Sequence, residues 1–263
     1  MGFRDLPDLR RRYFGQAGEL ANTFYIPVLS QAVSYDRQAG YFDTSSLVIA
    51  AAGIAAFIRN VSQITTPRQP PMRLITGATW SPADVDAFRL GETSLSNSIG
   101  QELVRHLEPD EHECVRLGLP FGWRPEKDQI AQHRLGALAW MIANGFLEVR
   151  VALPLDPSGR PYLPGRQGAL FHPKSGILAD ANADRISFQG SVNETGAAWA
   201  RNREKFDVRR SWFADLDAED IRGEIDEFDT IWGRQDPQLL ILPLPEAVRR
   251  SSSGATCFAV SGC

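Results

Sequence analysis

The stretch FHPKSGILADANADRISFQGSVNETGAAWARNRE, residues 171–204, decides the fold of this chain. Two segments that overlap this stretch, at 169–179 and 185–193, are rich in apolar residues and are separated by the short polar run DANAD. This pattern predicts two strands joined as a hairpin. Pairs of polar side chains two residues apart nevertheless occur in these apolar segments, where burying them costs free energy. The stretch therefore predicts a functional site as well as a fold.

Side chains two residues apart in a strand point to the same face of the sheet. The rule pairs residues on each predicted strand: His172 with Lys174, and Ser191 with Asn193. A hairpin brings the two pairs together. Asn202 and Glu204 follow about one helix length later and can return to the same end of the sheet.

The chemistry of this set is coherent. A neutral imidazole can attack phosphorus, and a lysine ammonium with Ser and Asn donors can hold the non-bridging phosphate oxygens. A carboxylate such as that of Glu204 can hold the second imidazole nitrogen and fix its tautomer. None of these roles requires a metal, so we expect neither a metal nor a cofactor.

Patterns elsewhere in the chain predict the rest of the domain. A strand at 35–42, an Ala-rich helix at 45–60 and a strand at 72–77 form a βαβ unit, which implies a parallel pair. An apolar helix at 132–145 ends at Gly145, where a left-handed residue is favoured, and a strand follows. An amphipathic helix occupies 217–234. The expected fold is α/β, a mixed and largely parallel sheet flanked by helices.

The predicted organisation has three parts. Residues 1–34 are expected to form a helical segment broken at Pro27, and residues 35–249 the main domain. Residues 108–127 are polar, contain proline and lack a pattern, which indicates an insertion. Residues 250–263 are expected to be a disordered tail.

Composition limits the function classes. The net charge is −4, so the chain is not a basic nucleic-acid coat, although a local basic groove stays open. The three cysteines form no close pair, which fits a reducing cytoplasm. We find no segment with the pattern of a signal peptide, and the most apolar run is too short to span a bilayer. We therefore expect a cytoplasmic protein with no membrane partner.

The three motifs HPK, GSVNET and NRE resemble those of the phospholipase D superfamily, H-x-K, G-S-x-N-x-T and N-x-E. The resemblance implies catalytic roles for four residues, His172, Lys174, Asn193 and Glu204. It implies substrate binding by four others, Gly190, Ser191, Thr195 and Asn202. The order of elements also resembles the phospholipase D-like module at the N-terminus of bacterial DEAD/DEAH-type helicases, some of which act in phage defence.

This resemblance implies a metal-independent phosphodiesterase that acts on nucleic acid through a phosphohistidine intermediate, with DNA favoured over RNA. The superfamily reaction uses two H-x-K motifs, whereas His172 is the only one of the four histidines in that form. A single motif per chain implies a homodimer that shares one active site. A helicase module is a further expected partner.

The sequence departs from the superfamily pattern after the lysine. The superfamily has an aspartate five residues further on, but here that position is Ala179 and the nearest acid is Asp180. The turn before Gly190 is also longer than usual. The missing aspartate leaves the strand register open, as well as the reading of a domain that has kept the fold and lost its activity.

Other interpretations remain. The alternative function is a non-catalytic DNA-binding or regulatory module fused to a helicase, with this chain a fragment. A lipid phosphodiesterase is disfavoured by the single motif and the missing membrane-binding stretch. The segment EHEC at 111–114 has no second ligand pair, which disfavours zinc. The basic residues of ARNREKFDVRR form either a phosphate track or a solvated face with ion pairs.

Overall fold

The computed structural model describes residues 2–15, 19–40, 42, 50–77, 137–138, 140–162, 169–192 and 204–243. Asn193, Thr195 and Asn202 lie outside these residues. So do the expected insertion at 108–127, the expected tail at 250–263 and the helices expected between residues 81 and 107. Within the described ranges, no helix has the length and apolar character needed to cross a membrane.

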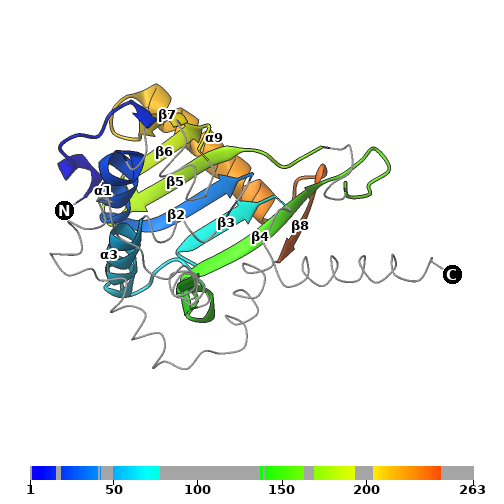
Figure 1. Ribbon diagram of the computed structural model, residues 1–263, viewed down its shortest axis with the longest axis horizontal. Helices are drawn as coiled ribbons and strands as arrows, with labels where there is room; N and C mark the ends of the chain where they lie inside the picture. Colours follow the sequence, from blue (N-terminus) through cyan, green and yellow to red (C-terminus); the bar gives the residue numbers. More distant parts are fainter. Residues whose placement is uncertain are drawn as a thin grey trace, which may run out of the picture.

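In the described part of the chain, eight strands form one sheet in the order β1-β7-β6-β5-β2-β3-β4-β8 (Figure 1). Their bounds are β1 (Arg12–Gly15), β2 (Ala32–Ala39), β3 (Met72–Thr76), β4 (Leu147–Pro154), β5 (Lys174–Asp180), β6 (Arg185–Gly190), β7 (Glu204–Arg210) and β8 (Leu239–Pro243).

The sheet is mixed, and our expectation of a largely parallel sheet is wrong. Strand β2 pairs parallel with β3, and β3 with β4, as the βαβ pattern predicts. Every other pairing is antiparallel. The reason lies in the connections, because a parallel neighbour needs a crossover of a dozen or more residues. The turn between β5 and β6 has only four residues, at 181–184, and so forces an antiparallel hairpin.

Helices cover both faces of the sheet. Figure 1 shows α9 (Asp215–Trp232) behind the sheet, with α1 (Ile26–Leu29) and α3 (Ala51–Ser62) on the other side. The predicted amphipathic stripe of α9 is confirmed, since Ile221, Phe228 and Ile231 are buried. Gly145 has a φ of 72°, the left-handed conformation predicted for that position.

The N-terminal segment does more than form helix. A short 3-10 helix, η1 (Phe3–Asp5), and a π-helical turn, η2 (Ala21–Tyr25), precede α1. Between them, β1 pairs antiparallel with β7 at the edge of the sheet. Tyr13 of β1 stacks on Phe206 of β7 at 5.1 Å between ring centroids, which anchors the strand in the core. The expectation of an all-helical segment before residue 35 is therefore wrong for β1.

The larger core lies on the face of α1 and α3. It is built around aromatic side chains from both ends of the chain, namely Tyr13, Phe24, Tyr25, Phe188 and Phe206. Residues of alternate parity on the same strands face α9 and form a second cluster with Phe228 and Ile231. We call these the aromatic face and the α9 face of the sheet.

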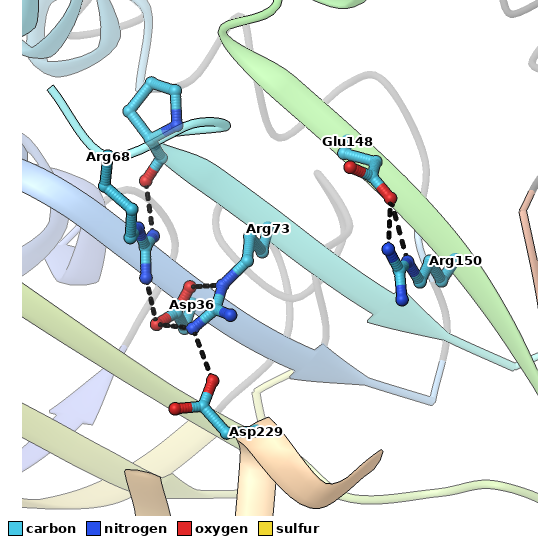
Figure 2. Close-up of polar contacts among 7 residues, drawn as sticks. Asp36, Arg68, Arg73, Glu148, Arg150 and Asp229 are labelled. Atoms are coloured by element: carbon cyan, nitrogen blue, oxygen red, sulfur yellow. Dashed lines mark hydrogen bonds and ion pairs between the residues drawn. The ribbon is translucent and has the colours of Figure 1, made fainter. Parts of the chain in front are cut away.

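An ion-pair network centred on the buried Asp36 ties α9 to the sheet (Figure 2). Asp36 of β2 accepts two hydrogen bonds from Arg73 of β3, at 2.7 and 2.8 Å, and one from Arg68 at 2.6 Å. Arg73 also pairs with Asp229 of α9 at 2.9 Å and lies over the Phe228 ring. The network therefore joins two central strands to the helix that covers them.

Candidate active site

The described motif residues gather at one edge of the sheet. Lys174 begins β5, Ser191 directly follows β6, and Glu204 begins β7. Because β6 is antiparallel to both of its neighbours, the start of β5, the end of β6 and the start of β7 meet at the same edge. Lys174 is also opposite Ala39, the last residue of β2.

Strand parity puts Lys174 and Glu204 on the aromatic face. Lys174 is the antiparallel partner of Ala39, which belongs to the aromatic core. Glu204 lies two and four residues before Phe206 and Val208 on β7, so it shares their face of the sheet, and both of these residues belong to the aromatic core. Lys174 and Glu204 therefore lie on the same face of the sheet, at the same end of their strands, with β6 between β5 and β7.

His172 lies just before β5 and against Gly40, which in turn packs against Gly77. A Cβ atom on Gly40 would lie 2.5 Å from the His172 Nδ1 atom, so only glycine leaves room for the imidazole in this position. A Cβ on Gly77 would lie 2.7 Å from the Gly40 carbonyl oxygen and 3.0 Å from that of Phe171. The ends of β2 and β3 thus form a glycine-lined seat for the histidine.

The environment of His172 favours its neutral form. Partial burial lowers the pKa of the imidazole, and the nearby Lys174 charge lowers that pKa further. The side chain is still exposed enough to meet a ligand. A neutral, accessible imidazole is the state that can act as a nucleophile.

Lys174 is half-buried, and its Nζ donates a hydrogen bond to the His172 carbonyl oxygen at 3.2 Å. Burial lowers the pKa of Lys174, the charge of Arg37 lowers it further, and Glu204 acts in the opposite direction. Lys174 therefore lies in the electrostatic field of both a buried cation and the motif glutamate.

Ser191 and Glu204 are linked across the ends of β6 and β7. The Ser191 hydroxyl donates to the Glu204 carboxylate and accepts the backbone N–H of Lys205 at 3.1 Å. The Ser191 backbone N–H donates to the Lys205 carbonyl oxygen at 3.0 Å. These contacts fix the serine directly after the last residue of β6.

Gly190 is explained by packing. A Cβ at this position would lie 2.6 Å from the Cα atom of Phe206, so any side chain would push β7 away from β6. The glycine of the motif thus permits the close approach that brings Ser191 to Glu204.

Arg37 lies beside the candidate site and was not predicted from the sequence. It is completely buried on β2, and its guanidinium donates to the Val192 carbonyl oxygen, one residue after Ser191. Its signal in the sequence was an arginine in phase with Tyr35 and Ala39, on the strand positions that point into the aromatic core.

Asp180, the acid nearest to the aspartate position of the superfamily, has a structural role. Its buried carboxylate accepts backbone N–H groups from Asn182 at 2.9 Å, Asp184 at 3.0 Å and Phe3 at 2.8 Å. It lies at the opposite end of β5 from Lys174, about 20 Å away for six residues of strand. It therefore closes the hairpin turn and pins the N-terminus.

The basic run beside the third motif forms no phosphate track among the residues that the structure describes. Arg209 is paired with Asp220 and Glu224 of α9, both at 2.9 Å. Arg210 donates to the Leu9 carbonyl oxygen and lies over Phe213. Lys205 alternates with Phe206 and so points to the α9 face, away from Lys174.

A search of the described residues finds no group of three or more His, Cys, Asp or Glu side chains that could hold a metal ion. His106, His112, His133 and the three cysteines lie outside those residues.

Comparisons with known proteins assign no family. No protein-family model matches the chain, and no curated protein matches it. Among solved structures, the chain is similar to NucT from Helicobacter pylori, with a TM-score of 0.44 and 12% sequence identity. The match covers 84% of this chain and 95% of that one. A likeness at this level assigns neither a family nor an activity.

Proposed function

We propose that this protein is a metal-independent phosphodiesterase that cleaves nucleic acid, DNA rather than RNA, with His172 as its nucleophile. The observation that carries the proposal is the meeting of three separated motif segments at one sheet edge, with Lys174 and Glu204 on the same face. The order of the same motifs in the sequence, and the neutral state favoured for His172, support it.

In the proposed first step, an imidazole nitrogen of His172 attacks the phosphorus of a backbone phosphodiester. A P–N bond forms, and the bond from phosphorus to the leaving sugar oxygen breaks. The leaving oxygen takes a proton from the second copy's His172, whose imidazole begins the cycle protonated and is left neutral by this step. Water then attacks the phosphohistidine and breaks the P–N bond. The deprotonated second imidazole accepts the proton of the water, which restores both histidines.

The remaining motif residues hold the charge that develops on phosphorus. Lys174 supplies a positive charge next to the nucleophile, and the Ser191 hydroxyl can turn from Glu204 to a phosphate oxygen. Glu204 orients the imidazole of His172. Asn193 is proposed as a further phosphate donor, and Gly190, Thr195 and Asn202 as parts of the binding segment. These last assignments follow the sequence motifs.

A homodimer follows from this mechanism, because one chain contributes one H-x-K motif and the reaction needs two imidazoles. Cytoplasmic location, association with a helicase module and a role in phage defence stay predictions from the sequence.

The decisive experiment is cleavage of plasmid and oligonucleotide DNA in excess EDTA. We expect the wild-type protein to cleave, and both His172→Asn and Lys174→Met to lose at least about 10³-fold in rate because the nucleophile or its phosphate-binding partner is gone. Lys205→Met is the matched control, since this exposed lysine points to the opposite face of the sheet.

Two outcomes would contradict the proposal. One is equal cleavage by wild type and folded His172→Asn. The other is DNA binding without cleavage, weakened by salt and unchanged by His172→Asn, which would favour the non-catalytic module.

A further inference from the structure

Arg37 is buried beneath the candidate site. It occupies β2, a central strand of the sheet, and its side chain is 0% exposed. Its position opposite Gly176 places it on the aromatic face, diagonal to Lys174 across the β2–β5 pair. Diagonal neighbours of this kind lie within reach of long side chains, at about 7–8 Å between backbones.

Contacts with Phe188 and with the Val192 backbone help to hold the guanidinium. The ring of Phe188 lies across Gly176, where a Cβ would be 2.5 Å from the ring's Cζ atom. The Arg37 guanidinium carbon lies 4.9 Å from the centroid of that ring. At its tip, Nη2 donates to the Val192 carbonyl oxygen. Gly176 thus makes room for the ring that supports Arg37, and Arg37 in turn supports the backbone just past Ser191.

Two cationic side chains, Arg37 and Lys174, therefore lie diagonal to each other on this face of the sheet, and Glu204 lies on the same face. Arg37 stays charged at any ordinary pH, and a fully buried cation is costly unless its surroundings compensate for it. Its charge acts on Lys174, whose pKa burial and Arg37 both lower. An anion bound against Lys174 would relieve this repulsion.

We propose that Arg37 is a positioning residue of this site, which holds the backbone at Val192 and supplies a buried positive charge that favours binding of a phosphate group beside Lys174. The assignment of phosphate as the ligand rests on the proposed function. The alternative is a purely structural role, in which Arg37 fills the core between Phe188 and Val192 without affecting the site.

The lysines of this chain allow a test that needs no catalytic turnover. Only three are present among its 28 Lys and Arg residues, namely Lys127, Lys174 and Lys205. Brief acetylation at controlled pH, read by peptide mass spectrometry, measures Lys174 and uses the exposed Lys205 as an internal reference. Each reaction is repeated with inorganic phosphate as the probe.

The two variants to compare are Arg37→Gln and Arg37→Lys, with folding checked by circular dichroism. Arg37→Gln removes the charge, so more of Lys174 is protonated and we expect its acetylation to slow several-fold at fixed pH. Phosphate should protect Lys174 in the wild type and fail to protect it in Arg37→Gln. Arg37→Lys keeps the charge and should restore both properties, whereas Lys205 should not respond to either change.

Unchanged acetylation and phosphate protection of Lys174 in folded Arg37→Gln would overturn the proposal and leave the structural role. If Arg37→Gln does not fold, Arg37→Lys decides the matter, because a folded Arg37→Lys protein without phosphate protection also overturns it. An inactive nuclease with the expected labelling pattern would contradict the proposed reaction and still support Arg37 as part of an anion site.

Discussion

The imidazole of His172 fits beside β2 because residue 40 has no side chain. We predict that Gly40→Ala lowers kcat by about 10²-fold, since the added methyl group displaces the proposed nucleophile from its position and a small misplacement of a reacting group slows the reaction strongly. The measurement is steady-state cleavage together with a thermal melt that shows the protein folded. Full activity of Gly40→Ala would show that the seat of His172 is not needed for the reaction.

Gly223 provides a matched control for that substitution. It lies within α9, and a Cβ there would meet no atom within 4 Å. Gly223→Ala should keep full activity and raise the free energy of unfolding by about 0.5–1 kcal/mol, because alanine loses less backbone entropy in a helix.

The pH behaviour of His172 can be predicted from its surroundings. Burial and the Lys174 charge both favour the neutral ring, so its pKa in the folded protein is lowered from 6.5 and the neutral form is the more populated one at that pH. Lys174→Met removes the smaller of the two causes. The pKa of His172 should then rise while remaining below 6.5, because burial is unchanged.

An NMR titration of the histidine ring protons measures this pKa, with the signal assigned by its loss in His172→Asn. A pKa at or above 6.5 in the wild type would contradict the environment described for the site. No change in Lys174→Met would contradict the coupling between the two side chains.

Asp36 supports the packing of α9 on the sheet, because it pairs with Arg73, which also pairs with Asp229 of α9. Its carboxylate serves both Arg68 and Arg73 in a nearly buried position. Asp36→Asn takes the carboxylate partner from Arg68 and leaves Arg73 with Asp229 alone. We expect a loss of about 3 kcal/mol in the free energy of unfolding, measured by urea denaturation.

Asp207→Asn is the control for Asp36→Asn. Asp207 pairs with Arg12 at 2.5 Å, but both side chains are more than half exposed, and water screens such pairs. The free energy of unfolding of Asp207→Asn should equal that of the wild-type protein. Equal, small losses for Asp36→Asn and Asp207→Asn would show that the buried network does not hold α9.

The whole molecule is expected to act as a pair of identical chains. If two copies of His172 are needed for one reaction, the specific activity should rise with protein concentration and level off where the dimer is fully formed. Sedimentation equilibrium over the same concentrations measures the association. A monomer with constant specific activity at every concentration would rule out the shared site.

The elements near the site were predictable from local patterns. Apolar runs indicated strands β2, β3, β5 and β6, a short polar run indicated the hairpin turn, and helical periodicity indicated the buried stripe of α9. The proportion of parallel pairing was not predictable in the same way, because strand order depends on which neighbours each strand finds. Strand β1 was missed for a related reason: its four residues gain their stability from Tyr13 packing on Phe206, far away in the sequence.

The sequence by itself determined which chemical groups are available for a site. The chain fixes the separation of His172, Lys174, Ser191 and Glu204, and the two-residue period of a strand predicts which side chains share a face. Tertiary structure alone decided what surrounds them. The contacts of His172 with Gly40, of Lys174 with the field of Arg37, and of Asp180 with Phe3 join residues far apart in the chain. Such contacts form only when the strands assemble into the sheet, because they depend on long-range packing and no local sequence pattern encodes them.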